Sequence, residues 1–326
     1  MEGRDPLQEI EPLFADGVRT FFGAPSVSGF EELNADVAFV GVPFDAGTPQ
    51  PGNRTGQSQG PAAARAASHE QFDGEPGGTA GLYDVESGRE LTGVRMADLG
   101  DVYIQGADEA RNFARMSAVA RGVVERGALL VAFGGDHSIS LPLARGVSEA
   151  EPVAVVHVDA HADFLDNLDG ARFSGASQLR RLAELPSIRG VSALGLRNVA
   201  RPEVEGMREL GVGWATTDDL IERGPEATVA ELVPAGVPLY VTVDLDVLDI
   251  ALVPGTTLPE PGGLSYRQLR ETLAAVAGRG RVVAIDVAEL NPPYDPSGAT
   301  ARIATWTVTH LLAEILARRG NQGTST

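Results

Sequence analysis

Acidic and imidazole side chains follow three apolar runs of the sequence, at the point where each run ends. The segments read "FGGDHS", "VHVDAHAD" and "VTVDLD". On an extended chain, residues two apart point to the same side, and open parallel sheets bind ligands beyond the carboxyl ends of their strands. We therefore expect six side chains to converge there: His137, Asp159, His161, Asp163, Asp244 and Asp246.

Four carboxylates crowded together repel one another unless a cation lies among them. Four carboxylates with two imidazoles form an oxygen-rich set that suits manganese better than zinc. Two such ions about 3.5 to 4 Å apart turn a water molecule into hydroxide near neutral pH. Each motif alone is also typical of a capped loop or a turn. All three at strand ends together favour a site for two Mn²⁺.

The composition excludes other chemistries. The chain has neither cysteine nor lysine, which excludes disulfides, thiolate metal sites, Schiff-base catalysis and a phosphate-binding P-loop. The net charge of −19 repels nucleic acid and anionic membranes and would attract a small cationic substrate, although solubility is the simpler explanation. No run is long enough to span a membrane and the N-terminus lacks a signal pattern, so we expect a cytoplasmic protein.

The elements that would position these residues are strands covered on both faces. Continuous apolar runs predict strands within 36–45, 128–137, 152–161, 191–197, 239–246 and 281–290. Amphipathic patterns predict helices at 107–127, 176–186, 265–278 and 300–318, and Ser265 with Gln268 fits a capping box. The alternation predicts an α/β protein with a mostly parallel, doubly wound sheet. We expect one domain over 1–326, with an N-terminal extension (1–35), a loop (46–61) and a disordered tail (320–326).

The segments "FGGDHSISLP", "VVHVDAHAD" and "VTVDLDVLDIALVPGTTLPEPGG" resemble the three signatures of the ureohydrolase family, which includes arginase and agmatinase. "PGTTLPEPGGLS" and "FFGAPSV" resemble the agmatinase-like branch. The resemblance implies a three-layer α/β/α fold of the arginase/deacetylase type, two Mn²⁺ and hydrolysis of a guanidinium group to urea and an amine. It also implies a homo-oligomer, a trimer or a hexamer.

Residue roles follow from the same resemblance. One metal would be held by His137, Asp159, Asp163 and Asp244, and the other by Asp159, His161, Asp244 and Asp246. Asp163 would also aim the bridging hydroxide. Glu289, in "DVAELNP", would grip the guanidinium through paired N–H bonds, the alternative being a helix N-terminal acid. Ser174 and Asn167 are further candidates for substrate contact.

The chain departs from the family pattern between Asp163 and Arg180, where relatives carry a His-Gly pair and this sequence reads "FSGASQLRR". His157 is the nearest other imidazole, and we expect it to support the site by packing or by hydrogen bonding. The departure leaves the substrate open. Agmatine or another small guanidino compound leads; the alternatives are a guanidino acid such as 4-guanidinobutanoate, a formimino substrate, a zinc deacetylase of the same fold, or a catalytically silent metal-binding protein.

Overall fold

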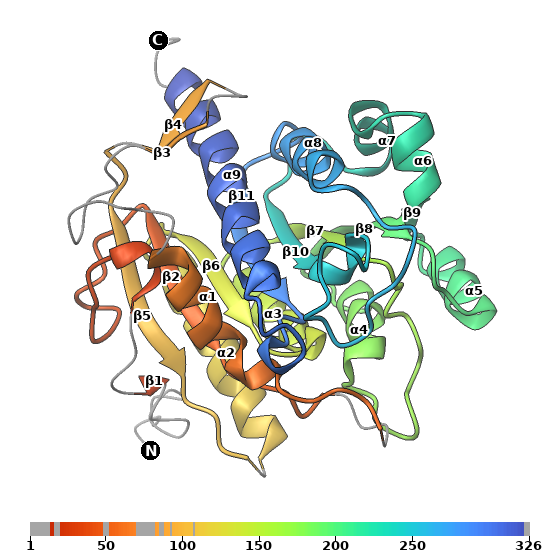
Figure 1. Ribbon diagram of the computed structural model, residues 1–326, viewed down its shortest axis with the longest axis horizontal. Helices are drawn as coiled ribbons and strands as arrows, with labels where there is room; N and C mark the ends of the chain where they lie inside the picture. Colours follow the sequence, from red (N-terminus) through yellow and green to blue (C-terminus); the bar gives the residue numbers. More distant parts are fainter. Residues whose placement is uncertain are drawn as a thin grey trace.

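A nine-stranded sheet forms the centre of the protein (Figure 1). The computed structural model describes residues 14–15, 20–47, 52–69, 82–84, 88–91, 93–106 and 108–322. The strand order is β1-β5-β2-β6-β11-β10-β7-β8-β9. All neighbours pair in parallel except β1 with β5, which confirms the mostly parallel sheet. The strands are β1 (Phe14–Ala15), β2 (Val37–Val42), β5 (Met96–Val102), β6 (Leu129–Gly134), β7 (Val153–Val158), β8 (Ile188–Leu196), β9 (Gly213–Thr216), β10 (Leu239–Asp244) and β11 (Val282–Ala288).

Helices cover both faces of this sheet. One face packs against α1 (Gly60–His69), α8 (Tyr266–Ala277) and α9 (Ala299–Gln322), and the other against α2 (Glu109–Glu125), α3 (Ser140–Ala150) and α4 (Gln178–Ala183). Successive residues of a strand point to opposite faces. In β6, Leu129, Val131 and Phe133 therefore pack with the first set of helices, and Leu130 and Ala132 with the second. This confirms the predicted three-layer α/β/α architecture.

The predicted strands and helices are all present, with shifted ends. The capping box of α8 is formed as expected, since the Ser265 hydroxyl accepts from the Gln268 backbone N–H at 3.3 Å. Residues 57–59 of the predicted loop form a short 3-10 helix, η3 (Gln57–Gln59), and residue 60 already begins α1; residues 48–51 lie outside the described part. Helix α9 runs to Gln322, into the segment expected to be a tail, and 323–326 lie outside the described residues.

Several elements were not predicted. They include α1, α3, β1, β5, β9, the helices α5 (Arg201–Glu209), α6 (Thr217–Glu222) and α7 (Pro225–Leu232), and the antiparallel pair β3 (Leu82–Asp84) and β4 (Arg89–Leu91). Strand β5 was hidden because Asp98, Gly100 and Asp101 interrupt its apolar run. In the described part of the chain, no helix is both long and apolar enough to cross a membrane.

Candidate metal centre and adjoining cavity

The six predicted ligands lie at the carboxyl ends of neighbouring central strands. In the sheet, β6, β11, β10 and β7 are adjacent. His137 follows β6 at the start of η4 (His137–Ile139), Asp244 ends β10, and Asp246 lies in η6 (Leu245–Val247). Asp159, His161 and Asp163 directly follow β7. The parallel sheet thus brings together all six residues that the strand-end pattern singled out.

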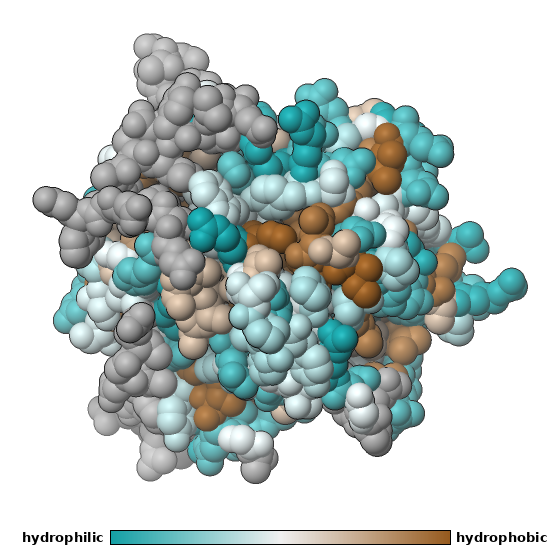
Figure 2. Space-filling model, in the orientation of Figure 1, coloured by the Kyte–Doolittle hydropathy of each residue, from teal (hydrophilic) through white to brown (hydrophobic). Residues whose placement is uncertain are grey.

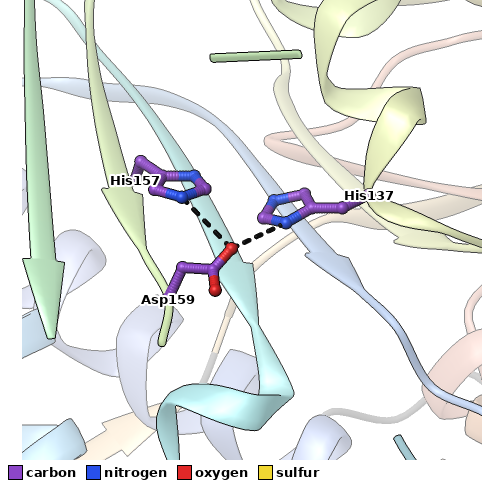
Figure 3. Close-up of side chains that lie close together, drawn as sticks. All are labelled: His137, His157 and Asp159. Carbon is purple, nitrogen blue, oxygen red and sulfur yellow. Dashed lines mark ion pairs between the residues drawn. The ribbon is translucent and has the colours of Figure 1, made fainter. Parts of the chain in front are cut away.

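His137 lies at the centre of the first group. Its Nδ1 is 2.9 Å from Asp159 Oδ2, 3.1 Å from Asp163 Oδ2 and 3.2 Å from Asp244 Oδ2. Figure 3 shows the ring of His137 pointing at Asp159. All these side chains are buried, and among the described residues neither His137 Nδ1 nor Asp159 Oδ2 has a hydrogen-bond partner. Unpaired buried donors and acceptors are rare, and the arrangement of these atoms fits ligands of a cation.

His161 lies at the centre of the second group. Its Nδ1 is 3.1 Å from Asp246 Oδ2 and 3.4 Å from Asp159 Oδ1. The two oxygens of Asp159 therefore face different imidazoles, Oδ2 toward His137 and Oδ1 toward His161. This is the orientation that a carboxylate shared by two cations requires.

The buried aspartates of the site repel one another, and a positive charge among them would stabilise their ionised forms. Burial, followed by the charges of Asp246 and Asp159, raises the pKa of Asp244 well above its usual range. Burial and the charge of Asp159 raise the pKa of Asp246 to about 6. Burial alone would lower the pKa of His161, but Asp246 and Asp159 raise it far above its usual value. A divalent cation would relieve this repulsion and keep the carboxylates ionised, so the donor set fits a metal pair.

Contacts of Nε2, on the side of the ring away from the carboxylates, fix the orientation of His137. Its Nε2 lies 2.8 Å from Thr242 Oγ1, and this hydroxyl donates to Asp286 Oδ1 at 2.8 Å. The Thr242 hydroxyl must therefore accept from Nε2–H, and in a neutral ring this tautomer would present the lone pair of Nδ1 to the carboxylates. Ser140 and Tyr240 also donate to Asp286. Such outer contacts set the tautomer of metal-binding histidines.

A third imidazole also reaches Asp159. His157 is fully buried and stacks on His137 with ring centroids 5.0 Å apart, and its Nε2 is 3.1 Å from Asp159 Oδ2 (Figure 3). The side chain of Gln178 approaches both His157 Nδ1 and Asp163 Oδ2 at 3.4 Å. The expected supporting role of His157 thus remains a prediction, with a geometry that fits it.

A cavity of about 280 Å³ opens beside the six residues. Glu289, which follows β11, lines it and is held in a left-handed backbone conformation, with φ at 64°. Its Oε1 accepts from the His137 backbone N–H at 2.7 Å, and its Oε2 accepts from the Thr257 hydroxyl and from Gln57 Nε2. Burial and the charge of Asp136 raise the pKa of Glu289 to about 7. It does not begin a helix, since the next one, η7 (Pro292–Tyr294), starts three residues later.

The two remaining candidates do not line the cavity. Asn167 is exposed, and its Oδ1 accepts from the Gly170 backbone N–H at 3.1 Å. Ser174 is buried, with its Oγ 3.1 Å from the hydroxyl of Ser177. The geometry therefore gives no support to a direct substrate contact by either residue. The segment that carries them lines the cavity at residues 165, 168, 175 and 176 instead.

Several residues that line the cavity were not predicted. Asn198 follows β8 by two residues, so the strand-end rule would have found it had it been applied to that strand. Glu203 belongs to α5, while Asn53, Thr257 and Leu258 belong to loops that carry no periodic signal. Asp163 shares with Glu289 a left-handed backbone, with φ at 49°. Such strain in residues without the freedom of glycine clusters at functional sites.

Comparison with known proteins places this geometry in context. The sequence profile of the arginase family matches residues 35–313. A guanidinopropionase from Pseudomonas aeruginosa is 35% identical, with 96% of this chain and 97% of that protein covered. An agmatinase from Bacillus anthracis is 30% identical, with 87% and 92% covered. The solved structure of proclavaminate amidino hydrolase from Streptomyces clavuligerus superposes with a TM-score of 0.77 at 29% identity, covering 92% of this chain and 97% of that one.

Proposed function

Because the chain belongs to the arginase family and is a metal-dependent amidinohydrolase, we propose that it hydrolyses the guanidino C–N bond of a small compound with a cationic tail. The products would be urea and an amine, and the cofactors two Mn²⁺. The observation that carries this proposal is the convergence of His137, His161 and four aspartates beside a cavity that also exposes Glu289.

The ligand atoms divide into two sets. One cation would be held by His137 Nδ1 with the carboxylates of Asp159, Asp163 and Asp244, and the other by His161 Nδ1 with those of Asp159, Asp244 and Asp246. Two divalent ions so held would lower the pKa of a water molecule and thereby supply a nucleophile at neutral pH. The excess of oxygen over nitrogen favours manganese over zinc.

Two acids would then act on the reactants. Asp163, at the edge of the first set, would accept a hydrogen bond from the attacking water and aim it. Glu289 would receive the guanidinium cation through a charge-assisted hydrogen bond, which is stronger than a neutral one. Both acids have a left-handed backbone conformation, which fixes the starting point of their side chains. Holding the carbon close to the nucleophile lowers the barrier by proximity and orientation.

The lining of the cavity favours a substrate with a cationic tail. Among the described residues that line it, none is an arginine, and the chain has no lysine, so a substrate carboxylate would find neither of these two cations there. Glu203 lines the wall and would attract an amine, while Leu165, Leu168 and Leu258 offer apolar contact to a methylene chain. These features favour agmatine over a guanidino acid. The similarity to a guanidinopropionase favours the acid, which is the second candidate.

A substrate panel tests the proposal. Protein loaded with Mn²⁺, with metal content measured, is incubated with agmatine, 3-guanidinopropanoate, 4-guanidinobutanoate and N-formiminoglutamate, and urea or formamide is quantified. We expect the highest kcat/KM with agmatine and no turnover after metal is removed by a chelator. Faster turnover of a guanidino acid would overturn the assignment of the tail. Absence of product from every compound at two Mn²⁺ per chain would overturn the enzymatic proposal and indicate a silent metal-binding protein.

A further inference from the structure

Two side chains from separate loops meet at one oxygen of Glu289. Gln57 lies in η3 and is 1% exposed, and Thr257 lies in the loop after η6 and lines the cavity. The Gln57 amide donates to the Thr257 hydroxyl and, at 3.2 Å, to Glu289 Oε2; the Thr257 hydroxyl donates to the same Oε2. The substrate-facing carboxylate is thus tied to two loops that lie 200 residues apart in the sequence.

The number of donors limits what Glu289 can still accept. A carboxylate has about four acceptor positions on its two oxygens. Oε1 receives the His137 backbone N–H, and Oε2 receives both Gln57 and Thr257. The position that remains is on Oε1. The Glu289 backbone is fixed as well, because its N–H donates to the Gly135 carbonyl at 2.9 Å.

The orientation of the Gln57 amide is determined by its surroundings. A flipped amide would place Oε1 against the Glu289 carboxylate, so the nitrogen must face it. In this orientation Gln57 Oε1 is buried and has no hydrogen-bond partner among the described residues. Leaving a buried acceptor unpaired is unfavourable, and a residue that served packing alone would gain nothing from it. The amide nitrogen thus faces Thr257 Oγ1, Glu289 Oε2 and, at 3.3 Å, the Arg54 carbonyl, which belongs to the same loop.

The loop that carries Gln57 is held rigidly. Arg54 Nη1 donates to the carbonyls of Pro254 and Thr256 at 3.1 and 3.0 Å, which joins the two loops directly. The guanidinium of Arg54 also lies 4.5 Å from the ring centroid of Tyr294. Gly56, with φ at 128°, has no room for a side chain, because a Cβ would lie 2.7 Å from Pro293 Cγ. Gln57 therefore has little freedom to move away from Glu289.

We propose that Gln57, together with Thr257, is a positioning residue for guanidinium recognition: the pair immobilises Glu289 Oε2, so that Oε1 alone receives an N–H of the substrate. This inference deepens the proposed function and rests on it. It differs from the paired N–H grip that we expected from the sequence, because the second oxygen is already engaged by the protein.

The first test replaces Gln57 by methionine, which keeps the length of the side chain and removes its N–H groups. Gln59→Met is the matched control, since Gln59 is an exposed residue of the same short helix. We expect Q57M to lower kcat/KM for the best guanidino substrate by about tenfold or more, mainly through KM, because hydrogen bonds to charged groups are strong. The Mn²⁺ content of Q57M should stay at two per chain. Equal losses in Q57M and Q59M, or a gain of activity in Q57M, would overturn the proposal.

A second pair of variants keeps the proposal testable if Q57M folds poorly. Thr257→Ser retains the hydroxyl donor and should behave like the wild type, whereas Thr257→Val should lose about as much as Q57M. The double variant Q57M/T257V should lose less than the product of the single losses, because both donors act on one oxygen. Additive effects, or a serine variant as impaired as the valine one, would contradict a shared positioning role.

Binding of the free guanidinium ion separates this inference from the proposed function. Calorimetric titration of the Mn²⁺-loaded protein with guanidinium chloride should give a Kd about tenfold higher for Q57M than for the wild type and for Q59M. If the wild type releases no urea from any compound of the panel, the proposed function fails while this measurement still tests the inference. An unchanged Kd in Q57M would overturn the inference even if the protein proves to be a hydrolase.

Discussion

Two clusters of buried charge in this protein are balanced in different ways. In the first, Arg65 is 1% exposed and lies between Asp98 and Asp101, with its Nε 3.2 Å from Asp98 Oδ2. Its guanidinium also lies 4.1 Å from the centroid of the Phe21 ring. In the second, the candidate metal centre, the described ion pairs of the four aspartates are with histidines.

The difference separates a structural cluster from a functional one. At Arg65 the chain supplies a permanent cation, so the fold itself compensates part of the negative charge of the two aspartates. At the metal centre it supplies imidazoles, which are good ligands when neutral but weak compensation for four carboxylates. Carboxylates that the chain does not neutralise itself are available to a cation from outside.

The largest effect is expected from removing a shared carboxylate. Asp159→Ala or Asp244→Ala should abolish binding of both Mn²⁺ ions and lower turnover by at least about a thousandfold, since either aspartate serves both ligand sets. Metal content and urea release measure the two effects. The exposed Asp218→Ala is the control and should retain both. If either variant kept two ions, the metal centre would not differ from the Arg65 cluster in the way described.

Removing the internal cation should affect stability instead of metal binding. Arg65→Met leaves Asp98 and Asp101 buried without their partner and should lower the free energy of unfolding by ~3–5 kcal/mol. Urea denaturation of the Mn²⁺-loaded protein measures this change, with the exposed Arg201→Met as the control. Metal content should be unchanged. Loss of Mn²⁺ at unaltered stability would reverse the roles that we assign to the two clusters.

A smaller effect would sharpen the comparison at the metal centre itself. Thr242→Val removes the hydroxyl that links His137 Nε2 to Asp286, and we expect Mn²⁺ affinity to fall about 10- to 100-fold. Thr242→Ser should restore it. Thr228→Val, which alters a buried threonine in α7 far from the site, serves as the control for competition with a chelator. Equal affinities for the valine variant and the wild type would show that the ring of His137 needs no support from Thr242.

The convergence of the six candidate ligands was the most predictable part of the site. These residues lie at the ends of buried parallel strands, where the run of apolar residues, the spacing of two and the topology of the sheet all indicate the same edge. The strands that carry them are buried on both faces and therefore read as continuous apolar runs. The fold class followed from the same pattern.

The features that could not be predicted depend on contacts between loops and on buried charges that a distant residue compensates. Gln57 and Thr257 meet because two loops are joined through Arg54, and no periodicity in the sequence reports such a contact. Strand β5 was missed for another reason: Asp98 and Asp101 look like surface residues until Arg65, from a helix more than 30 residues earlier, is placed between them. When a residue distant in the sequence compensates the charges of a buried strand, no local sequence pattern indicates that the strand is buried.

Hydrophobic surface lies beside α9, near the middle of the face seen in Figure 2. Separately, the exposed large apolar side chains of the chain include Ile250, Leu258 and Tyr294. Leu258 also lines the cavity, so this exposed side chain belongs to the wall that we assign to the substrate chain. Scattered apolar side chains are otherwise normal on a protein surface.

The left-handed backbone at Asp163 and Glu289 bears on how this sequence can diverge. Of the twenty amino acids, glycine adopts that conformation without strain, so selection for a sound fold and selection for turnover oppose each other at these two positions. A descendant that abandoned hydrolysis while keeping its scaffold would be expected to drift toward glycine there. Retention of both acids in distant descendants would indicate that catalysis had been maintained.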